Sequence, residues 1–377
     1  MRESAAAKKK EVRSTMQNRI IILYDHSGFF ATKIIEKNGR RETGGMDVRL
    51  LEAGFASEGF SVTSRSFAEV DFTADAEGVF VLYASSEDRG MFYKQYIADV
   101  LLALREKGAV LIPGYTFFSA HSNKVLQEML RKSFRDERLR IPASVAIGEA
   151  GELRHVAEQI TFPAVVKLSG GSGSRGVERV DTKEAMASAV RRMMTHFYGD
   201  CYDTPYKRFG LFIKRVIRRV IGRRVNGETL LRKLHTNRII IQEMIPGLTG
   251  DYKVLFFFGR YFVLQRDNRD GDFRASGSGK FHFPKTAEEV GDVLSLAKAA
   301  SEEITSPLLS LDICRGKDAC YLLEFQCVFF GPYTLQYAPV CFFEENGRWG
   351  TESGPFELEK EYVRAISAYI RSGMGTV

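Results

Sequence analysis

The sequence predicts an α/β protein that is α+β in part, and two observations support that prediction. Short apolar runs alternate with helical patterns up to about residue 115, which is the order of a parallel sheet with helices on both faces. From about residue 116 onward, strand-like runs follow one another across glycine-containing turns, which is typical of antiparallel pairing. The 377 residues, 44% of them hydrophobic, are enough for two or three packed units.

The first part of the chain is expected to fold as an α/β domain over residues 18–115. Residues 19–24 form a continuous apolar run, as in a strand that is buried on both faces. Apolar residues at spacings of three and four predict helices over 47–58 and 91–107, and Gly108 ends the second helix. Three further strands are expected at 60–63, 79–83 and 109–112.

The rest of the chain is expected to divide near residue 245, into a smaller subdomain at 116–245 and a carboxyl-terminal subdomain at 246–377. The smaller subdomain contains a basic insert at 201–237. A helix is predicted from residue 182 to about residue 197, with Asp181 or Thr182 as its N-cap. The other expected helices and strands lie at 123–129, 164–168, 177–180, 238–245, 252–258, 260–266, 286–304, 308–314 and 319–326.

A glycine-rich stretch follows Lys167. Residues 169–176 contain four glycines and three serines. The backbone N–H groups of such a loop can close over a polyphosphate without obstruction by side chains. A lysine just before the loop can reach a phosphate oxygen. The alternative is a glycine-rich turn at the tip of a hairpin.

Residues 242–245, with the sequence Gln-Glu-Met-Ile, end a predicted strand just before Pro246 and Gly247. Backbone groups at such a position can pair with the edge of an adenine, and the Asp251 carboxylate is placed to accept ribose hydroxyls. The alternative is a buried strand followed by an exposed acid.

A loop dense in charge and glycine covers residues 266–279. Its cations, which include Arg266 and Arg274, are of the kind expected where a γ-phosphate is transferred, and its glycines let the backbone approach a substrate. A solvated surface connection is the alternative.

Two acids, Asp312 and Glu324, lie inside apolar runs that are predicted to be consecutive strands. A carboxylate inside a buried strand is unfavourable unless it is paired or binds a metal. With Gln326 two residues after Glu324, these strands offer an oxygen ligand set suited to Mg²⁺. The alternative is a salt bridge to Arg266 or Arg274.

The order of these features resembles that of the ATP-grasp superfamily over residues 115–345, in particular its glutamate-ligase and D-alanine–D-alanine-ligase-like enzymes. The resemblance implies an ATP-grasp fold with an amino-terminal parallel-sheet domain. It implies metal ligation by Asp312, Glu324 and Gln326, where Gln326 stands in place of the usual Asn, and catalytic roles for Arg266, Arg274 and Lys253. It implies nucleotide-binding roles for Lys124, Lys167, Ser172, Gly173, Ser174, Gly176, Gln242, Glu243, Ile245 and Asp251.

The resemblance also implies an activity. The expected reaction joins a carboxylate to an amine at the expense of ATP, through an acyl phosphate, with Mg²⁺ or Mn²⁺ as the metal. The alternative is a kinase-like or regulatory ATP-binding protein without an amine acceptor. His121 and His282 either face the site or are structural. Candidates for the substrate surface lie after the first and third strands, because ligands bind at the carboxyl ends of parallel strands: Asp25, His26, Ser27, Gly28, Ser85, Ser86 and Glu87.

The insert is strongly basic, with eleven Lys or Arg and one acid between Lys207 and Arg238. Apolar residues within it have helical spacing and predict one apolar face: Phe212, Val216, Ile217, Val220 and Ile221. Such a helix packs on the nucleotide-binding subdomain, lies on an anionic membrane surface, binds an acidic glycan or other polyanion, or binds a partner protein. A nucleic acid is not expected, because exposed aromatic residues are not interleaved with the basic ones.

Residues 1–17 are rich in Ala and Lys, lack the apolar core of a signal peptide, and are expected to be a disordered tail. We therefore expect a cytoplasmic protein, with peripheral attachment to the inner membrane surface as an open option. A homodimer is also left open. The carboxylate substrate is expected to be a small molecule, a glycan or a peptide. The five cysteines form no Cys-x-x-Cys pair, which argues against a zinc site and a disulfide framework, and three of them in apolar strand-like stretches are expected to be buried reduced thiols: Cys314, Cys320 and Cys327.

Overall fold

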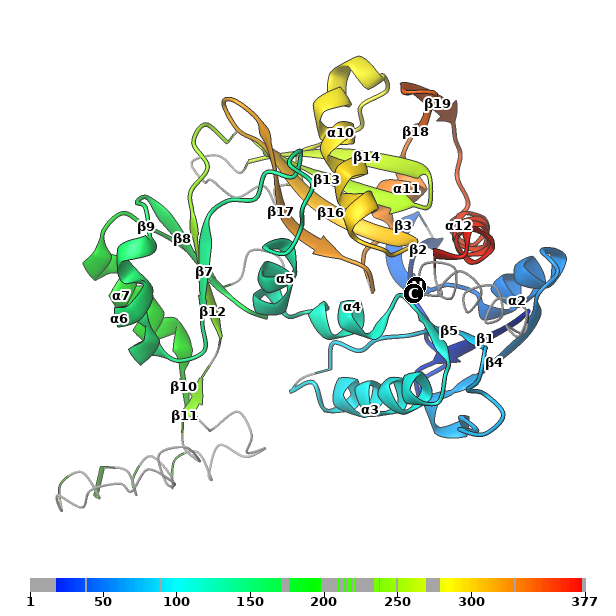
Figure 1. Cartoon of the computed structure of the whole chain (residues 1–377), viewed down its shortest axis with the longest axis horizontal. Helices are drawn as coiled ribbons and strands as arrows, with labels where there is room; N and C mark the ends of the chain where they lie inside the picture. The colour runs from blue at the N-terminus through cyan, green and yellow to red at the C-terminus, as the bar shows by residue number, and fades with distance from the viewer. Residues whose placement is uncertain are drawn as a thin grey trace, which may run out of the picture. The chain divides into compact units, whose positions relative to one another are not determined.

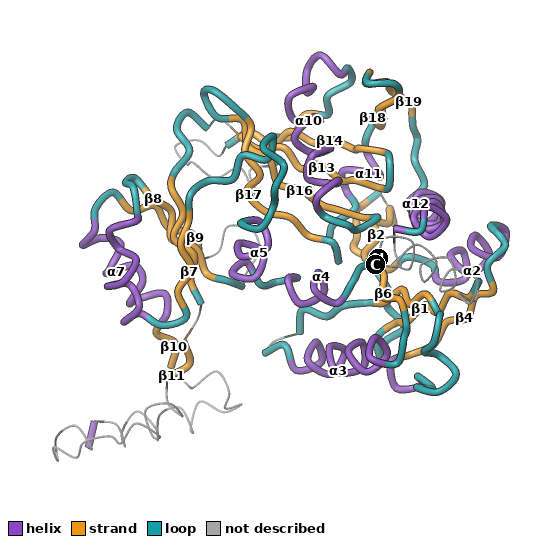
Figure 2. Tube along the Cα trace, viewed as in Figure 1, coloured by secondary structure: helices purple, strands orange, loops and turns teal. Residues whose placement is uncertain are grey.

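The structure, a computed structural model, describes residues 18–37, 39–88, 90–170, 176–197, 234–236, 238–248, 250–268, 279–328 and 330–374, and the single positions 209, 213, 216, 217 and 220. The chain forms two compact units, drawn in Figures 1 and 2. The larger unit contains Met1–His121, Ser133–Ile141 and Gly247–Val377, and the smaller unit contains Ser122–Lys132 and Pro142–Pro246.

A four-stranded parallel sheet forms the first part of the larger unit. Its strands lie in the order β4, β1, β5, β6: β4 (Ser61–Ser66), β1 (Arg19–Tyr24), β5 (Phe80–Tyr83) and β6 (Val110–Ile112). Helices α2 (Val48–Ser57) and α3 (Phe92–Glu106) alternate with these strands. Residues 20–23 of β1 are at most 1% exposed, as expected for a strand buried on both faces. The predicted four strands and two helices are confirmed, with small shifts at their ends.

A hairpin of β2 (Thr32–Lys37) and β3 (Arg40–Gly45) was not predicted. Most of its residues are exposed or half-buried, and its second strand has no apolar side chain. Without an alternating apolar face, the sequence carries little sign of a strand here.

The second sheet of the larger unit has seven strands and is antiparallel. Its order is β17, β16, β13, β14, β18, β19, with β15 paired to β14. The strands are β13 (Gly250–Phe257), β14 (Arg260–Asp267), β15 (Phe281–His282), β16 (Leu308–Arg315), β17 (Cys320–Gln326), β18 (Val340–Glu345) and β19 (Arg348–Ser353). The predicted hairpins at 252–266 and 308–326 are therefore confirmed. The helices of this part are α10 (Ala287–Glu303), α11 (Tyr333–Tyr337) and α12 (Leu358–Ser372), and a short 3₁₀ turn, η1 (Phe67–Glu69), follows β4.

A short helix, α4 (Tyr115–Ala120), contacts both sheets of the larger unit. The ring of Phe118 packs on Tyr83 of β5 at a centroid distance of 5.7 Å, edge to face. The neighbouring Phe117 packs on Phe325 of β17 at 6.5 Å. Through these contacts, α4 fixes the carboxyl end of the parallel sheet near the carboxyl end of β17.

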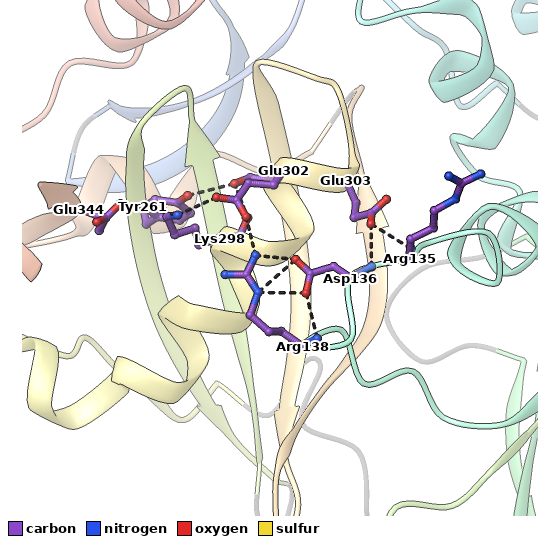
Figure 3. Close-up of polar contacts among 9 residues, drawn as sticks. Arg135, Asp136, Arg138, Tyr261, Lys298, Glu302, Glu303 and Glu344 are labelled. Carbon is purple, nitrogen blue, oxygen red and sulfur yellow. Dashed lines mark hydrogen bonds and ion pairs between the residues drawn. The ribbon is translucent and has the colours of Figure 1, made fainter. Parts of the chain in front are cut away.

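Polar contacts hold residues 133–141 against α10 (Figure 3). The Glu303 carboxylate accepts hydrogen bonds from the backbone N–H groups of Arg135, at 2.9 Å, and Asp136, at 2.7 Å. The Arg138 guanidinium donates three hydrogen bonds to the Asp136 carboxylate and a further one to Glu302. Exposed ion pairs are each worth only about 1 kcal/mol or less, so these contacts mainly fix the path of the chain.

The smaller unit is built on an antiparallel sheet in the order β7, β12, β8, β9, with helix α7 packed against β8 and β9 (Figure 2). Its core includes Val166, Met186, Val190, Ile239 and Ile241. Its elements are α5 (Lys124–Arg131), β7 (Ser144–Ile147), η2 (Ala150–Glu152), α6 (Leu153–Val156), η3 (Ala157–Gln159), β8 (Ala164–Leu168), β9 (Val177–Val180), α7 (Lys183–Met194), β10 (Thr195–Phe197), β11 (Leu234–Thr236) and β12 (Ile239–Glu243).

The helix predicted to reach about residue 197 ends at Met194. Residues 195–197 form β10, which pairs antiparallel with β11. Pairing with a strand forty residues away in the sequence overrides the local helical pattern, and local propensity cannot reveal such a partner.

Within the described residues, none of the helices is both long and apolar enough to cross a lipid bilayer. The predicted burial of Cys314, Cys320 and Cys327 is confirmed; Cys341 is buried as well, and none of these four described cysteines forms a disulfide. Cys201 lies outside the described residues.

Candidate functional site

Charged side chains from four neighbouring strands share one face of the seven-stranded sheet. In the strand register, Lys253 of β13 lies opposite Asp312 of β16, and Asp312 lies opposite Glu324 of β17. On the other side of β13, Arg266 of β14 lies opposite Asp251. Directly opposed residues of antiparallel strands have Cβ atoms about 4.5–5.5 Å apart, and alternate residues share a face. The register therefore gathers five residues that are distant in the sequence.

The Asp312 carboxylate is paired with two cations. Its Oδ1 lies 3.3 Å from Lys253 Nζ and 3.2 Å from a terminal guanidinium nitrogen of Arg266. Burial disfavours the ionised form, but the two positive charges outweigh it and hold the pKa of Asp312 well below its ordinary value. The ion pair with Arg266 that the sequence left open is thus present. Arg274 lies outside the described residues.

Arg266 also binds Asp251 through two parallel hydrogen bonds, of 2.6 and 2.8 Å. Burial, reinforced by repulsion from Asp312, raises the pKa of Asp251 to about 6 against the pull of Arg266. Both oxygens of Asp251 therefore face a guanidinium, and the expected contact with a ribose stays a prediction.

Gln326 extends this row along β17. Its side-chain N–H donates to Glu324 Oε1 at 3.4 Å, and a bulge in the pairing of β16 with β17 follows Asp312. The two carboxylates and the amide carbonyl are oxygen donors on one face, a donor set that fits Mg²⁺. Among the described residues, no group of three or more His, Cys, Asp and Glu is placed to hold a metal ion.

In the smaller unit, the start of α5 is joined to the end of β8. The backbone N–H of Lys124 donates to the Ser169 carbonyl at 2.9 Å, and the Ser169 hydroxyl donates to the Asn123 side chain at 3.1 Å. Lys167, two residues before Ser169, donates to the Gln242 side-chain oxygen at 2.5 Å. Both lysines predicted to bind phosphates are therefore anchored beside the glycine-rich stretch. Asn123 and Ser169, whose contacts join the two elements, were not predicted to matter.

The glycine-rich stretch closes a hairpin between β8 and β9. The Leu168 N–H donates to the Gly176 carbonyl at 2.9 Å. Gly176 has a φ of +71°, and a Cβ atom on it would lie 2.5 Å from Leu168 Cδ1, so only glycine fits there. Three residues predicted to bind the nucleotide lie outside the described residues: Ser172, Gly173 and Ser174.

The predicted adenine-binding residues follow the end of β12. Glu243 bonds the backbone of Ala143 twice, through its own N–H and through its carboxylate, each at 2.8 Å. The Met244 N–H donates to the Pro163 carbonyl at 3.0 Å. Among the described residues, the Ile245 N–H has no hydrogen-bond partner. A backbone donor is therefore available for an adenine nitrogen at this position.

No protein-family model and no curated protein matches the sequence. Among solved structures, the chain is similar to the D-cycloserine synthetase DcsG, with 14% sequence identity and a TM-score of 0.50 over 93% of this chain and 99% of that one. The chain has the ATP-grasp fold.

Two other solved structures are similar to this ATP-grasp chain. The ATP-grasp ligase PsnB, complexed with minimal precursor, Mg and ADP, has 13% identity and a TM-score of 0.49, over 94% of this chain and 98% of that one. A D-alanine–D-alanine ligase from Bacillus anthracis, complexed with ATP, has 11% identity and a TM-score of 0.48, over 94% and 98%. At these identities the likeness concerns the fold and not the reaction.

The two histidines of this ATP-grasp chain that the sequence analysis singled out differ in their surroundings. The His282 side chain is exposed and lies 3.3 Å from Glu289. The His121 side chain is fully buried, with Nε2 3.5 Å from the Glu87 carboxylate. Lys94, whose ammonium donates to the His121 carbonyl, was not predicted, because a single lysine in an amphipathic helix reads as a solvated residue.

In the basic insert, the described positions 209, 213, 216, 217 and 220 are helical, and Leu234–Thr236 form β11. Of the predicted apolar face, Val216, Ile217 and Val220 are 46%, 49% and 81% exposed. Phe212 and Ile221 lie outside the described residues. The three described side chains of this face are therefore exposed rather than packed on the nucleotide-binding subdomain.

Proposed function

We propose that the protein is an ATP-dependent ligase that joins a carboxylate to an amine through an acyl phosphate. One observation supports this proposal most strongly: Lys253, Asp312 and Glu324 lie opposite one another on neighbouring strands of an ATP-grasp fold. Arg266 lies beside this row, within ion-pair distance of Asp312. Phosphoryl transfer is catalysed mainly by positioning and by charge stabilisation, and such a row supplies fixed charges of both signs.

The nucleotide is proposed to use the residues of the smaller unit. Lys124 and Lys167 would contact phosphate oxygens, and the loop at 169–176 would cover them. The adenine would accept from the Ile245 N–H and donate to a backbone carbonyl nearby. The remaining predicted contacts are with Gln242 and Glu243 of the smaller unit and with Asp251, which belongs to the larger unit.

A divalent cation is proposed to bind on the larger unit. Asp312, Glu324 and Gln326 would hold Mg²⁺ through oxygen atoms, and Mn²⁺ has the same ligand preference. When bound, this ion neutralises charge on the β- and γ-phosphates. Lys253 and Arg266 keep Asp312 ionised and in place before the ion arrives.

The proposed reaction has two steps. A carboxylate oxygen attacks the γ-phosphorus, the bond from that phosphorus to the bridging oxygen breaks, and ADP leaves. The amine nitrogen then attacks the carbonyl carbon of the acyl phosphate, inorganic phosphate leaves, and the nitrogen loses its extra proton. Arg266 and Arg274 would stabilise the transferred phosphoryl group and the oxyanion, a role worth about 3–4 kcal/mol for one well-placed donor.

Hydroxylamine trapping tests this proposal. We expect the protein to release ADP with one carboxylate of a panel and to form the corresponding hydroxamate. Glu324→Gln should lower the rates of ADP release and of hydroxamate formation at least about 100-fold, because it removes one charged ligand from the proposed metal site. Glu302→Gln, which neutralises an exposed acid of α10, serves as the control and should react normally.

Two results would argue against the ligase. A folded Glu324→Gln protein with normal turnover would exclude the metal assignment. Release of ADP without hydroxamate, for every carboxylate tested, would favour the kinase-like alternative, in which no acyl phosphate forms.

A second proposal concerns the basic insert, which we infer binds an anionic membrane surface. Its exposed apolar residues have helical spacing and are interspersed with the eleven Lys and Arg residues: Phe209, Ile213, Val216, Ile217 and Val220. A basic helix with an apolar face binds anionic lipid through both features. We expect co-sedimentation with phosphatidylserine-containing vesicles and not with neutral ones, and its loss in Val220→Asp. Binding to a soluble polyanion alone would favour the glycan alternative.

A further inference from the structure

A small cavity lies at the carboxyl ends of two strands of the parallel sheet. It is lined by Tyr83 and Ser85, at and just after the end of β5, and by Ile112 and Pro113, at and just after the end of β6. Its volume is about 60 Å³, several times the roughly 10–15 Å³ that one water molecule needs. In open α/β sheets, ligands bind outside the carboxyl ends of the strands. The cavity therefore lies where a ligand is expected, and it has room for a group of a few non-hydrogen atoms.

The seven-stranded sheet of the same unit also contributes to the lining. Phe257 ends β13, Leu308 begins β16, and Cys327 directly follows the end of β17. The residue before Cys327 is Gln326, the amide of the proposed metal site. The Cα atoms of neighbouring residues are about 3.8 Å apart, so the cavity adjoins the strand that carries Glu324 and Gln326.

Two buried hydroxyl groups of the lining have no hydrogen-bond partner among the described residues. One belongs to Ser85, which is 3% exposed, and the other to Tyr362 of α12, which is 8% exposed. Burial raises the pKa of Tyr362, and neither a hydrogen bond nor a charge contributes to that rise. The Tyr83 hydroxyl, in contrast, donates to the Pro113 carbonyl at 2.6 Å. A buried hydroxyl without a partner is unfavourable, so a ligand that bonds to Ser85 and Tyr362 would relieve this cost.

The lining that the described residues provide contains no charged side chain. Burial raises the pKa values of Tyr83 and Cys327 as well as that of Tyr362, so all three side chains are neutral at neutral pH. A charged group would lose its hydration here without gaining an ionic partner, which is strongly unfavourable. The charged residues next to the lining in the sequence make other contacts: Lys33 pairs with Glu359, Glu357 with Lys360, and Glu361 with Arg260 and Arg364, while Asp47 caps α2. The cavity is therefore suited to an uncharged group.

We propose that this cavity binds a short uncharged group of the carboxylate substrate, and that a hydroxyl, carbonyl or amide of this group bonds to Ser85 and Tyr362. The inference rests on the proposed ligase function and names the chemical class of the first substrate, a carboxylate whose other end is small and uncharged. The reacting carboxylate stays outside the cavity, because it has to reach the γ-phosphate beside the proposed metal site. Since a hydroxyl both donates and accepts, Ser85 and Tyr362 can bond to either kind of polar atom.

The test uses Ser85→Ala, and its matched control is Ser367→Ala. Ser367 of α12 is 1% exposed and its hydroxyl also has no partner among the described residues, but it does not line the cavity. Each substitution removes a buried hydroxyl without a partner, so neither should lower the free energy of unfolding. Only Ser85→Ala should raise the KM of the accepted carboxylate, about 3- to 10-fold, with kcat and the KM of the amine unchanged. Tyr362→Phe should have the same effect as Ser85→Ala.

An unchanged carboxylate KM in both Ser85→Ala and Tyr362→Phe would overturn the inference, and so would an equal rise in Ser367→Ala or a change confined to the amine. If the wild-type protein turns over no carboxylate, the ligase proposal fails and the cavity is tested directly with 2-propanol, a small uncharged alcohol. Saturation-transfer NMR should then detect 2-propanol on the wild type and on Ser367→Ala, with a weaker signal on Ser85→Ala. Equal signals on the three proteins would exclude the site.

Discussion

The ammonium group of Lys94 is largely buried from solvent. Burial lowers its pKa from 10.5 to about 8, although Glu87 and Asp88 pull the other way. Below about pH 8 the lysine is protonated in both the folded and the unfolded state, so the folded state bears the full cost of the buried charge, about 2–3 kcal/mol. As the pH rises toward 10.5, the folded state loses that charge first and the cost disappears.

The resulting prediction concerns the pH dependence of stability. Between about pH 7 and pH 10, the free energy of unfolding of the wild type should rise relative to that of Lys94→Met by about 2 kcal/mol, measured by urea denaturation. The control is Lys298→Met, because a hydrogen bond to Glu302 raises the pKa of that exposed lysine. It should show a small trend of the opposite sign. The prediction would be contradicted if the free energies of unfolding of the wild type and Lys94→Met changed in parallel with pH.

At the scale of elements, the hairpin of β8 and β9 depends on a single backbone conformation. Gly176 has a φ of +71° and lies against Leu168, so any side chain there is strained and also collides. Because the same hairpin carries Lys167 and the proposed phosphate loop, distortion at Gly176 should reach the nucleotide. The loss of stability should stay limited, since the rest of the sheet of the smaller unit is paired independently.

We therefore predict that Gly176→Ala weakens ATP binding about tenfold and lowers the free energy of unfolding by about 1–2 kcal/mol. Isothermal titration calorimetry with a non-hydrolysable ATP analogue measures the change in nucleotide affinity. Gly148→Ala is the matched control, because Gly148 lies in the same unit outside the proposed phosphate loop, has an ordinary φ, and its nearest neighbour would lie 3.7 Å from the added atom. Equal affinities of the two variants would show that the hairpin conformation is not needed.

At the scale of the whole molecule, the sequence predicted the buried elements well and the polar ones poorly. The apolar strands β1, β5, β13, β14 and β16 follow from their composition. The β2–β3 hairpin and β10 do not, because the first has no apolar face and the second depends on a distant partner. The opposition of Asp312 and Glu324 followed from consecutive strands, whereas their pairing with Lys253 and Arg266 required the register of β13 and β14.

The residues proposed to bind the nucleotide and those proposed to bind the metal belong to different units, which gives a separate prediction for each unit. The nucleotide residues Lys124, Lys167 and Ile245 belong to the smaller unit, and the metal residues Asp312 and Glu324 to the larger. An ATP analogue without metal should slow hydrogen exchange in β8 and β12 only. A ligand that binds only the folded state, at a concentration of about 100 times its Kd, raises the free energy of local unfolding by about 2.7 kcal/mol.

Added Mg²⁺ should in addition slow hydrogen exchange in β16 and β17, because Asp312 and Glu324 on those strands would then hold the ion. Hydrogen exchange followed by mass spectrometry measures both effects in one experiment. In Glu324→Gln, the analogue should still protect β8 and β12, but Mg²⁺ should no longer protect β16 and β17. The variant removes a proposed metal ligand and leaves the proposed nucleotide residues intact. Protection of β16 and β17 by the analogue alone, or its persistence in Glu324→Gln, would contradict the assignment of the metal to these strands.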